Sequence, residues 1–480
     1  MSLSIFRDHD GHGKDDARFR DASSLSSCDT TVVPQSNRSL GPDLVRALAA
    51  ILVVYLHAGV AYLNHPMPGL VWSTQDTPSS VVSHFFWSIE LFIMPLFLLL
   101  AGFFAYRSWI ASGDVGLIRS RARRLLVPML AAAVVLLPID YLIWLVGWVI
   151  DGSLSADRIW PPKFPRDMRQ HLFGFAHLWF LLYVFLYCVV LAGFGLIRQR
   201  AFARPGEEAT ASVEPSGGRF GKSSQALFAL ACALPLIGTC VLWWAPEVVF
   251  GFQHAFMPVA SKWLYSGTFF FGGVAMAAID PRMSFATAKA ERLIGVGAVC
   301  GVAAILLGQW AIERADSTSL AMEIGLVARV SLASLTVVSA WTTSLGLIGL
   351  GNLASPILLQ RPQARRAIAY LAAASFWIYL VHHPIVALLH IDLKLVLPGF
   401  SPLAKSLIVT LVALGIAIAS YEVMIRGRVL GRVLGLDGSA QRPAQTAEVT
   451  NANESTTTGL RQDSATPTIS MPDRSIRRAA

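Results

Sequence analysis

The chain has 480 residues, of which 54% are hydrophobic and only 14% are charged. A water-soluble protein could not cover its surface with so few charged side chains, so the composition excludes a soluble globular fold. The net charge of +9 comes from Lys and Arg residues dispersed over short connections and tails, which excludes a nucleic-acid-binding face as its cause.

The chain begins with a polar segment, residues 1–40, in which Asp, Ser, Arg and His are mixed. This segment lacks the short apolar core and cleavage site of a secretory signal peptide, so we expect the first membrane helix to target the protein. We predict that residues 1–40 form a disordered cytoplasmic tail. Residues 436–480 are rich in Ser, Thr, Asn, Gln and Ala, and the same prediction applies to them because they contain little that can pack.

Ten apolar segments lie between the two tails, and each is long enough to cross about 30 Å of hydrocarbon as a helix. They lie near 42–62, 80–106, 125–150, 171–197, 225–244, 263–279, 292–312, 324–350, 366–390 and 401–425. The sequence therefore predicts an all-α integral membrane protein of about ten transmembrane helices, with a membrane domain over residues 41–430. The third segment is the least regular, because Pro138 and Asp140 interrupt it.

Lys and Arg concentrate in alternate connections, which is typical of loops retained on the cytoplasmic side. The connection 107–124 holds five arginines, whereas 63–79 holds neither Lys nor Arg. Residues 151–170 depart from this pattern with four positive side chains, which three aspartates offset. The alternation predicts a multi-pass protein of the bacterial inner membrane with both termini in the cytoplasm, and a cytoplasmic linker at 203–224.

A few titratable side chains lie inside the apolar segments, where each costs about 2.5–3.5 kcal/mol near a helix centre and is therefore a functional candidate. They are Asp43, Arg46, His57, His84, Glu90, His177, His382, His383 and His390. With a helical rise of about 1.5 Å per residue, four histidines reach the outer third of the bilayer from different helices. These four are His57, His84, His177 and His382, and Glu90 lies deeper.

Histidine suits proton transfer at neutral pH, and a carboxylate such as Glu90 can fix its tautomer. The alternative is that these histidines are interfacial anchors, like Trp and Tyr at the same level. Arg46 can also extend to the cytoplasmic boundary, and Asp43 can favour the helix dipole. Arg121 and Arg124 either mark topology or bind an anionic ligand such as a cofactor phosphate. The five cysteines show no zinc-ligand spacing, so we expect no metal site.

Five motifs occur in an order and spacing that indicate a family. Asp43 and Arg46 are followed, after ten residues, by His57. The other motifs are PLFLLLAGFF at 95–104, Arg121-x-x-Arg124 with Pro128 after it, HLWFL at 177–181 and SFWIYLVHHP at 375–384. In these motifs, residues 40–425 resemble the membrane acyltransferase-3 family, whose LDxLR…H pattern the first motif matches, and its branch of glucan-modifying succinyltransferases. The chain departs from that family at Ala101, where Ser is usual, and at 376–377, where Phe-Trp replaces a frequent Tyr-Ser.

The resemblance implies a membrane-bound O-acyltransferase that moves an acetyl or succinyl group from cytoplasmic acyl-CoA to a hydroxyl of an extracytoplasmic carbohydrate or glycolipid. Acyl-CoA would be a co-substrate, and no permanently bound cofactor is expected. The expected catalytic residues are His57, which would act as the base, Glu90, Asp43, His177 and His382. The residues expected to bind acyl-CoA are Arg46, Arg121 and Arg124, and those expected to contact the substrate are Trp179, Tyr379 and His84.

The strongest alternative from another class is a transporter or exporter of a glycan or lipid intermediate, because buried His and Glu also form proton relays. The sequence shows neither inverted-repeat symmetry nor paired helices broken by Gly or Pro, which argues against a transporter. A third alternative, a non-catalytic membrane scaffold, would have no need of titratable side chains inside the bilayer.

Overall fold

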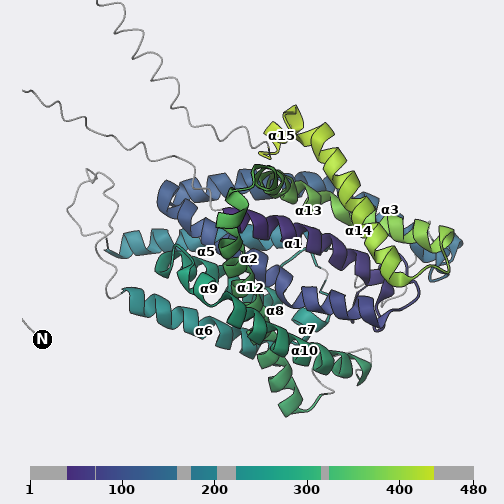
Figure 1. The fold of residues 1–480 in the computed structure, drawn as a ribbon, viewed down its shortest axis with the longest axis horizontal. Coiled ribbons are helices and arrows are strands. Elements are labelled where there is room, and N and C mark those ends of the chain that lie inside the picture. Colours follow the sequence, from purple (N-terminus) through teal and green to yellow (C-terminus); the bar gives the residue numbers. More distant parts are fainter. Residues whose placement is uncertain are drawn as a thin grey trace, which may run out of the picture. The chain divides into compact units, whose positions relative to one another are not determined.

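The computed structural model describes residues 40–70, 72–158, 174–202, 223–253, 255–314 and 324–436. Within these ranges all regular secondary structure is helical (Figure 1), which confirms the predicted all-α class. Nearly all of the two predicted tails and of the predicted linker lies outside the described residues.

In the described part of the chain, ten long helices overlap the ten apolar segments that the sequence predicts. They are α1 (Leu40–Gly59), α2 (Ser80–Arg121), α3 (Val127–Ile150), α5 (Trp179–Phe202), α6 (Ser223–Trp244), α8 (Ala260–Ile279), α10 (Ala290–Arg314), α12 (Leu326–Leu359), α13 (Pro362–Val396) and α14 (Pro402–Ser420). The short helices are α7 (Glu247–Phe250), α9 (Ser284–Ala288) and α15 (Val429–Val433). Pro138 lies inside α3, so the irregular third segment is still one helix.

Seven continuous helical stretches in the described part of the chain are long and apolar enough to cross a membrane, judged by length and composition. The chain is therefore a multi-pass membrane protein. One stretch, Ser80–Ile150, has 71 residues, although a single crossing takes about 20. Its backbone leaves helical geometry at Gly113, where φ is 68° and ψ is −175°. Glycine adopts this positive φ without a Cβ clash, and the break divides the stretch into two helices.

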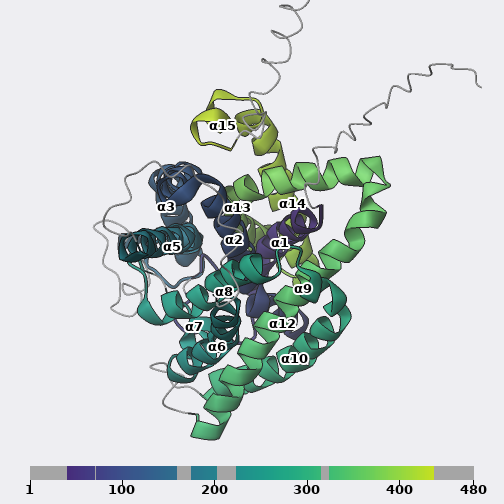
Figure 2. The same cartoon turned by 90° about the vertical axis from the view of Figure 1, so that its left-hand side faces the viewer.

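Helix α1 lies among several other helices. It contacts α2, α12, α13 and α14, and Figure 2 shows these helices around it. Its side chains Val53, Val54 and Ala58 are at most 1% exposed, as expected for apolar residues that face helices on several sides. Because this packing fixes α1, it also fixes the positions of Arg46 and His57 near its two ends.

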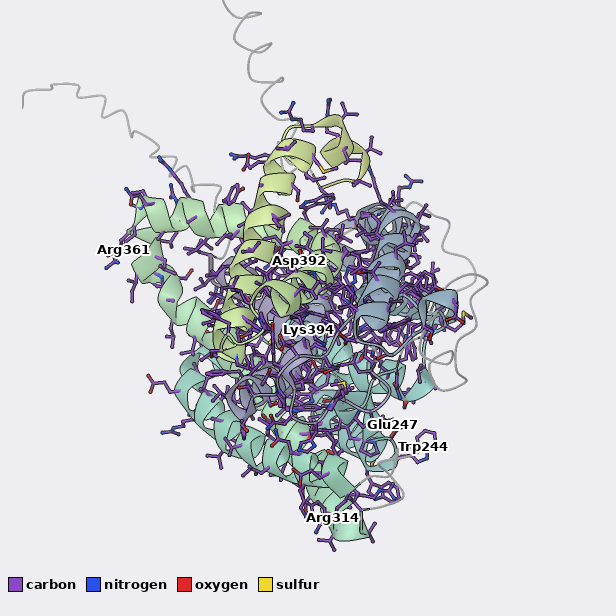
Figure 3. All side chains as sticks on the ribbon, turned by 90° about the vertical axis from the view of Figure 1, so that its right-hand side faces the viewer. Trp244, Glu247, Arg314, Arg361, Asp392 and Lys394 are labelled. Atoms are coloured by element: carbon purple, nitrogen blue, oxygen red, sulfur yellow. The ribbon has the colours of Figure 1, made fainter. Side chains whose placement is uncertain are left out.

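The two ends of α1 define the two ends of the helix bundle. We call the end that carries Asp43, Arg46 and residues 119–124 the arginine end. We call the end that carries residues 63–79 and the start of α14 the loop end. Figure 3 views the bundle from the loop end, with Lys394 of α13 labelled.

Ion pairs hold the connection between α1 and α2 against other helices at the loop end. Lys405 Nζ lies 2.8 Å from Asp76 Oδ2, and these side chains are only 1% and 7% exposed. Lys394 Nζ lies 2.6 Å from Asp151 Oδ1, which also accepts a hydrogen bond from the Thr74 hydroxyl. The connection is thus anchored to α13, to α14 and to the residue that follows α3.

Helices α2 and α8 approach each other so closely that only glycine fits at their contact. A Cβ on Gly102 would lie 1.9 Å from the carbonyl oxygen of Phe270, and one on Gly273 would lie 2.0 Å from that of Leu99. Small residues let membrane helices pack backbone against backbone. The glycine of the PLFLLLAGFF motif therefore serves helix packing.

We expect Gly102→Ala to lower the apparent melting temperature of the purified protein in detergent. The added Cβ meets a backbone oxygen that cannot rotate away, so the two helices must separate, at a cost of roughly 3 kcal/mol. Gly415→Ala is the matched control, because nothing lies within 4 Å of a Cβ built at Gly415. Equal melting temperatures for the two variants would show that the close contact of α2 and α8 is wrong.

The buried Asp76–Lys405 pair should make stability depend on pH. Burial by itself would raise the pKa of the Asp76 carboxyl, but hydrogen bonds from Lys405 and the Thr77 backbone, together with the charge of Lys405, hold it below its ordinary value of 3.8. Such a carboxyl stabilises the folded state fully above its unfolded-state pKa, and this contribution is lost as pH falls through the lowered pKa.

We therefore expect Asp76→Asn to lower the apparent melting temperature near neutral pH, because it leaves Lys405 buried without a counter-charge, at a cost of about 3–5 kcal/mol. The difference from the wild type should shrink as pH falls below 3.8. The double variant Asp76→Asn, Lys405→Met should recover part of the loss. A difference that stays constant across the whole pH series would contradict the ion pair.

Candidate active site

A cavity of about 1080 Å³, including the part open to solvent, lies toward the loop end. Five of the residues predicted to be catalytic or to contact the substrate line it: His57, Glu90, His177, Trp179 and Tyr379. They come from α1, α2, the turn before α5, α5 itself and α13. The predicted convergence of polar side chains from different helices therefore occurs in the structure, although their roles stay predictions.

The tautomer of His57 follows from its hydrogen bonds. Its Nδ1 lies 2.9 Å from the carbonyl oxygen of Val53, and a carbonyl oxygen can only accept. Nδ1 therefore carries the hydrogen, and in the neutral ring Nε2 carries the lone pair. His57 lines the cavity, so it can act as a proton acceptor there.

His382 supports this arrangement of His57. Its own Nδ1 lies 2.8 Å from the carbonyl oxygen of Tyr379, which assigns the hydrogen to Nδ1 and the lone pair to Nε2. That Nε2 lies 3.3 Å from His57 Nδ1. The hydrogen on His57 Nδ1 is therefore shared between two acceptors, His382 Nε2 and the Val53 carbonyl oxygen. The His382 side chain is fully buried and does not line the cavity, so it contacts His57 from behind.

His177 is positioned by helix α13. Pro384 has no N–H, so the carbonyl of Leu380, four residues earlier, lacks its usual helical donor. His177 Nε2 lies 2.9 Å from this oxygen and donates its hydrogen to it, which leaves the lone pair on Nδ1. The hydroxyl of Tyr379 in turn donates to the backbone carbonyl of His177. The preceding Ala176 has a φ of 45°, an uncommon conformation for a residue with a Cβ, and this turn brings His177 to the cavity.

Asp140 and His383 form a buried pair that sequence reasoning missed. His383 Nδ1 lies 3.0 Å from Asp140 Oδ1, and the two side chains are 5% and 6% exposed. The His383 ring stacks on that of His177, with centroids 4.7 Å apart and planes 12° apart. The signal was present in the sequence, because a carboxylate in the middle of an apolar helix requires a partner, although Asp140 was predicted only to interrupt its helix.

Glu90 faces a different partner from the one the sequence suggests. It lines the cavity together with Lys262, and the opposite charges of these two groups interact. The Lys262 ammonium also lies 3.9 Å from the ring centroid of Trp179, within the range of a cation–π contact. Among the described residues Glu90 makes no hydrogen bond to a histidine, and its role in fixing a histidine tautomer stays a prediction.

The residue that completes the cavity wall beside His57 is Trp72, from the connection between α1 and α2. Its ring centroid lies 6.3 Å from that of His57 and 5.0 Å from that of His383. Trp72 Nε1 donates to His390 Nδ1 at 2.9 Å, and its backbone carbonyl accepts from Trp148 Nε1 at 2.7 Å. Hydrogen bonds to α3 and α13 therefore hold this ring against the histidines.

Of the residues predicted to be catalytic or to contact the substrate, two lie away from the cavity and its histidines. His84 is exposed, and its Nδ1 lies 2.6 Å from the carbonyl oxygen of Ser80. Asp43 Oδ1 lies 3.7 Å from Arg46 Nη1. Asp43 precedes His57 by 14 positions on α1. At about 1.5 Å per residue, these 14 positions separate the two side chains by roughly 21 Å, so Asp43 does not contact His57.

The three predicted donor-binding arginines gather at the arginine end. The charges of Arg46 and Arg124 both act on Arg121, and repulsion between such groups favours an anion among them. Arg121 Nη2 donates to the carbonyl oxygen of Phe104 at 3.1 Å, while its buried Nε has no hydrogen-bond partner among the described residues. Arg46 and His57 share α1 and lie roughly 16 Å apart along its axis.

The family model Acyl_transf_3, described as an acyltransferase domain, matches residues 39–422. Two curated relatives, both named glucans biosynthesis protein C, come from Salmonella heidelberg (strain SL476) and Salmonella typhimurium (strain LT2). Each is 25% identical over 400 residues, which cover 80% of this chain and 91% of the relative.

Proposed function

Because this chain belongs to the acyltransferase-3 family and is an acyltransferase, we propose that it moves an acyl group from cytoplasmic acyl-CoA to a hydroxyl of an extracytoplasmic glucan or related glycolipid. An acetyl or a succinyl group fits the resemblance of the sequence. The names of the relatives suggest the glucan. The observation that carries the reaction is the hydrogen bonding of His57, which assigns the lone pair to Nε2 on the wall of a cavity.

The proposed topology has ten crossings of the bacterial inner membrane and both termini in the cytoplasm. It is supported by the ten long helices, by the break at Gly113 inside the long α2 and by the alternation of Lys and Arg between connections. In this topology the arginine end is cytoplasmic, where acyl-CoA is available. The loop end, with the cavity, faces the extracytoplasmic side, where a glucan can enter.

In the proposed reaction, His57 Nε2 takes the proton of the acceptor hydroxyl while that oxygen attacks the thioester carbonyl carbon. The new C–O bond forms, the C–S bond breaks, and the imidazolium returns the proton to the departing CoA thiolate. While His57 is positively charged, its Nδ1–H still donates to the Val53 carbonyl and to His382 Nε2. These two acceptors stabilise the charge, which gives His382 a positioning role.

The arginine end is proposed to hold the phosphates of acyl-CoA. Arg121, Arg124 and Arg46 supply three guanidinium groups near one another, and guanidinium binds phosphate through paired, charge-assisted hydrogen bonds. The thioester lies at the far end of the long pantetheine arm of CoA. A donor bound at the arginine end can therefore extend along α1 toward His57.

We expect His57→Ala to reduce transfer by roughly 10²- to 10⁴-fold, because it removes the proposed general base. Inverted membrane vesicles supplied with labelled acyl-CoA and a glucan acceptor would measure the label that becomes covalently bound to the glucan. His65→Ala is the matched control, since His65 is partly exposed and pairs with Glu313 at 3.1 Å outside the cavity. Near-normal transfer by a folded His57→Ala protein would refute the assignment of the base, and label transported without covalent attachment would favour the exporter.

We expect Arg121→Ala and Arg124→Ala to raise the KM for acyl-CoA with a smaller effect on kcat. Loss of one charge-assisted hydrogen bond costs about 1.5–3 kcal/mol, which corresponds to roughly 10- to 100-fold. Arg314→Ala is the control, because Arg314 ends α10 and lies over the ring of Trp310, outside the arginine cluster. An unchanged KM in both variants would reduce Arg121 and Arg124 to markers of topology.

A further inference from the structure

Asp140, His177 and His383 form a cluster that the proposed acyl transfer does not use. All three side chains are buried, and one potential ligand atom from each lies within 4.8 Å of the other two. They come from α3, from the turn before α5 and from α13. Three separate elements thus bring two imidazoles and one carboxylate to one point.

The hydrogen bonds of His177 prepare it to bind a cation. Its Nε2–H is directed to the Leu380 carbonyl at 2.9 Å, so the lone pair on Nδ1 is available. That Nδ1 is buried and has no hydrogen-bond partner among the described residues. His177 as a whole is only 6% exposed. Metal-binding histidines commonly show this arrangement, in which the second ring nitrogen donates to a backbone carbonyl and fixes the tautomer.

The other two groups supply a nitrogen and an oxygen at a suitable spacing. His383 Nδ1 and Asp140 Oδ1 lie 3.0 Å apart, and two ligands on one tetrahedral zinc ion lie roughly 3.4 Å apart. All three ligand atoms lie within 4.8 Å of one another, so shifts of the side chains on the order of an ångström or less bring them to the spacing of a tetrahedral zinc ion. The proton now held between His383 and Asp140 would move to His383 Nε2 or be released, as metal binding to histidine requires.

Charge also favours a cation at this place. With neutral imidazoles, the cluster contains one negative charge on a buried carboxylate, and opposite charges attract strongly in a low-dielectric interior. This carboxylate therefore favours a divalent cation beside the two imidazoles. A proton and a metal ion compete for the same His383 nitrogen.

We propose that Asp140, His177 and His383 bind a divalent transition-metal cation of the zinc class. Two imidazole nitrogens and one carboxylate oxygen match the preference of zinc rather than that of magnesium or calcium, which favour oxygen ligands. Three protein ligands leave one position open. His177 and His383 both line the cavity, so this open position would face the same space as His57, whose ring centroid lies 5.4 Å from that of His383.

The test is zinc binding by the purified full-length protein in detergent, after removal of any affinity tag and treatment with a chelator. Competition with a chromophoric chelator should show one strong site in the wild type. Asp140→Asn, His177→Ala and His383→Ala should each weaken zinc binding by at least roughly tenfold. Cobalt(II) in place of zinc should give the intense visible absorption of a four-coordinate ion, and this absorption should be lost in the same variants.

A control separates this cluster from other histidines. His65→Ala removes a partly exposed histidine at the loop end. It should leave zinc affinity unchanged, while His383→Gln checks that folding survives at the cluster. Zinc binding that is absent, that is unaffected by all three cluster variants or that is lost in His65→Ala would overturn the proposal. Because the readout is binding, it does not depend on whether acyl transfer is confirmed.

Discussion

A proline in α13 leaves the carbonyl of Leu380 without its helical donor, and inside a membrane such a group must find another. Pro384 creates this requirement, and His177 Nε2 satisfies it at 2.9 Å. The bond joins the turn before α5 to α13 and fixes the tautomer of His177. A residue that would weaken an isolated helix therefore determines where a buried imidazole lies.

The same helix organises most of the site. His382 contacts His57 on α1, the next residue, His383, contacts Asp140 on α3, and His390 accepts from Trp72. His390 also donates to the carbonyl of Ala58, near the end of α1, where the last carbonyls of a helix lack internal partners. Adjacent residues on one helix point in different directions, about 100° apart, so His382 and His383 can serve two neighbouring helices at once.

The helices could be predicted from the sequence because the thickness of the membrane sets the minimum length of an apolar segment that crosses it. Locating these segments along the chain requires no knowledge of which helices contact each other. The depth of His57, His177 and His382 followed from the helical rise alone, and these residues do lie together. Asp140 could not be matched to His383 in this way, because depth does not say which faces of two helices meet. Glu90 shows the same limit, since its charge partner, Lys262, lies in the first turn of α8, and its place in the sequence indicates only topology.

The charges of the molecule are arranged differently at its two ends. At the loop end, Asp76 and Asp151 are paired with lysines, so positive and negative groups cancel and the connection above the cavity is held in place. At the arginine end, neighbouring guanidinium groups repel Arg121, and Arg46 Nη1 lies 3.7 Å from Asp43 Oδ1. The concentration of three guanidinium groups favours a mobile anion there. Helix α1 joins this end to the histidines, so a ligand with an anionic head and a long arm fits the distance that the helix itself sets.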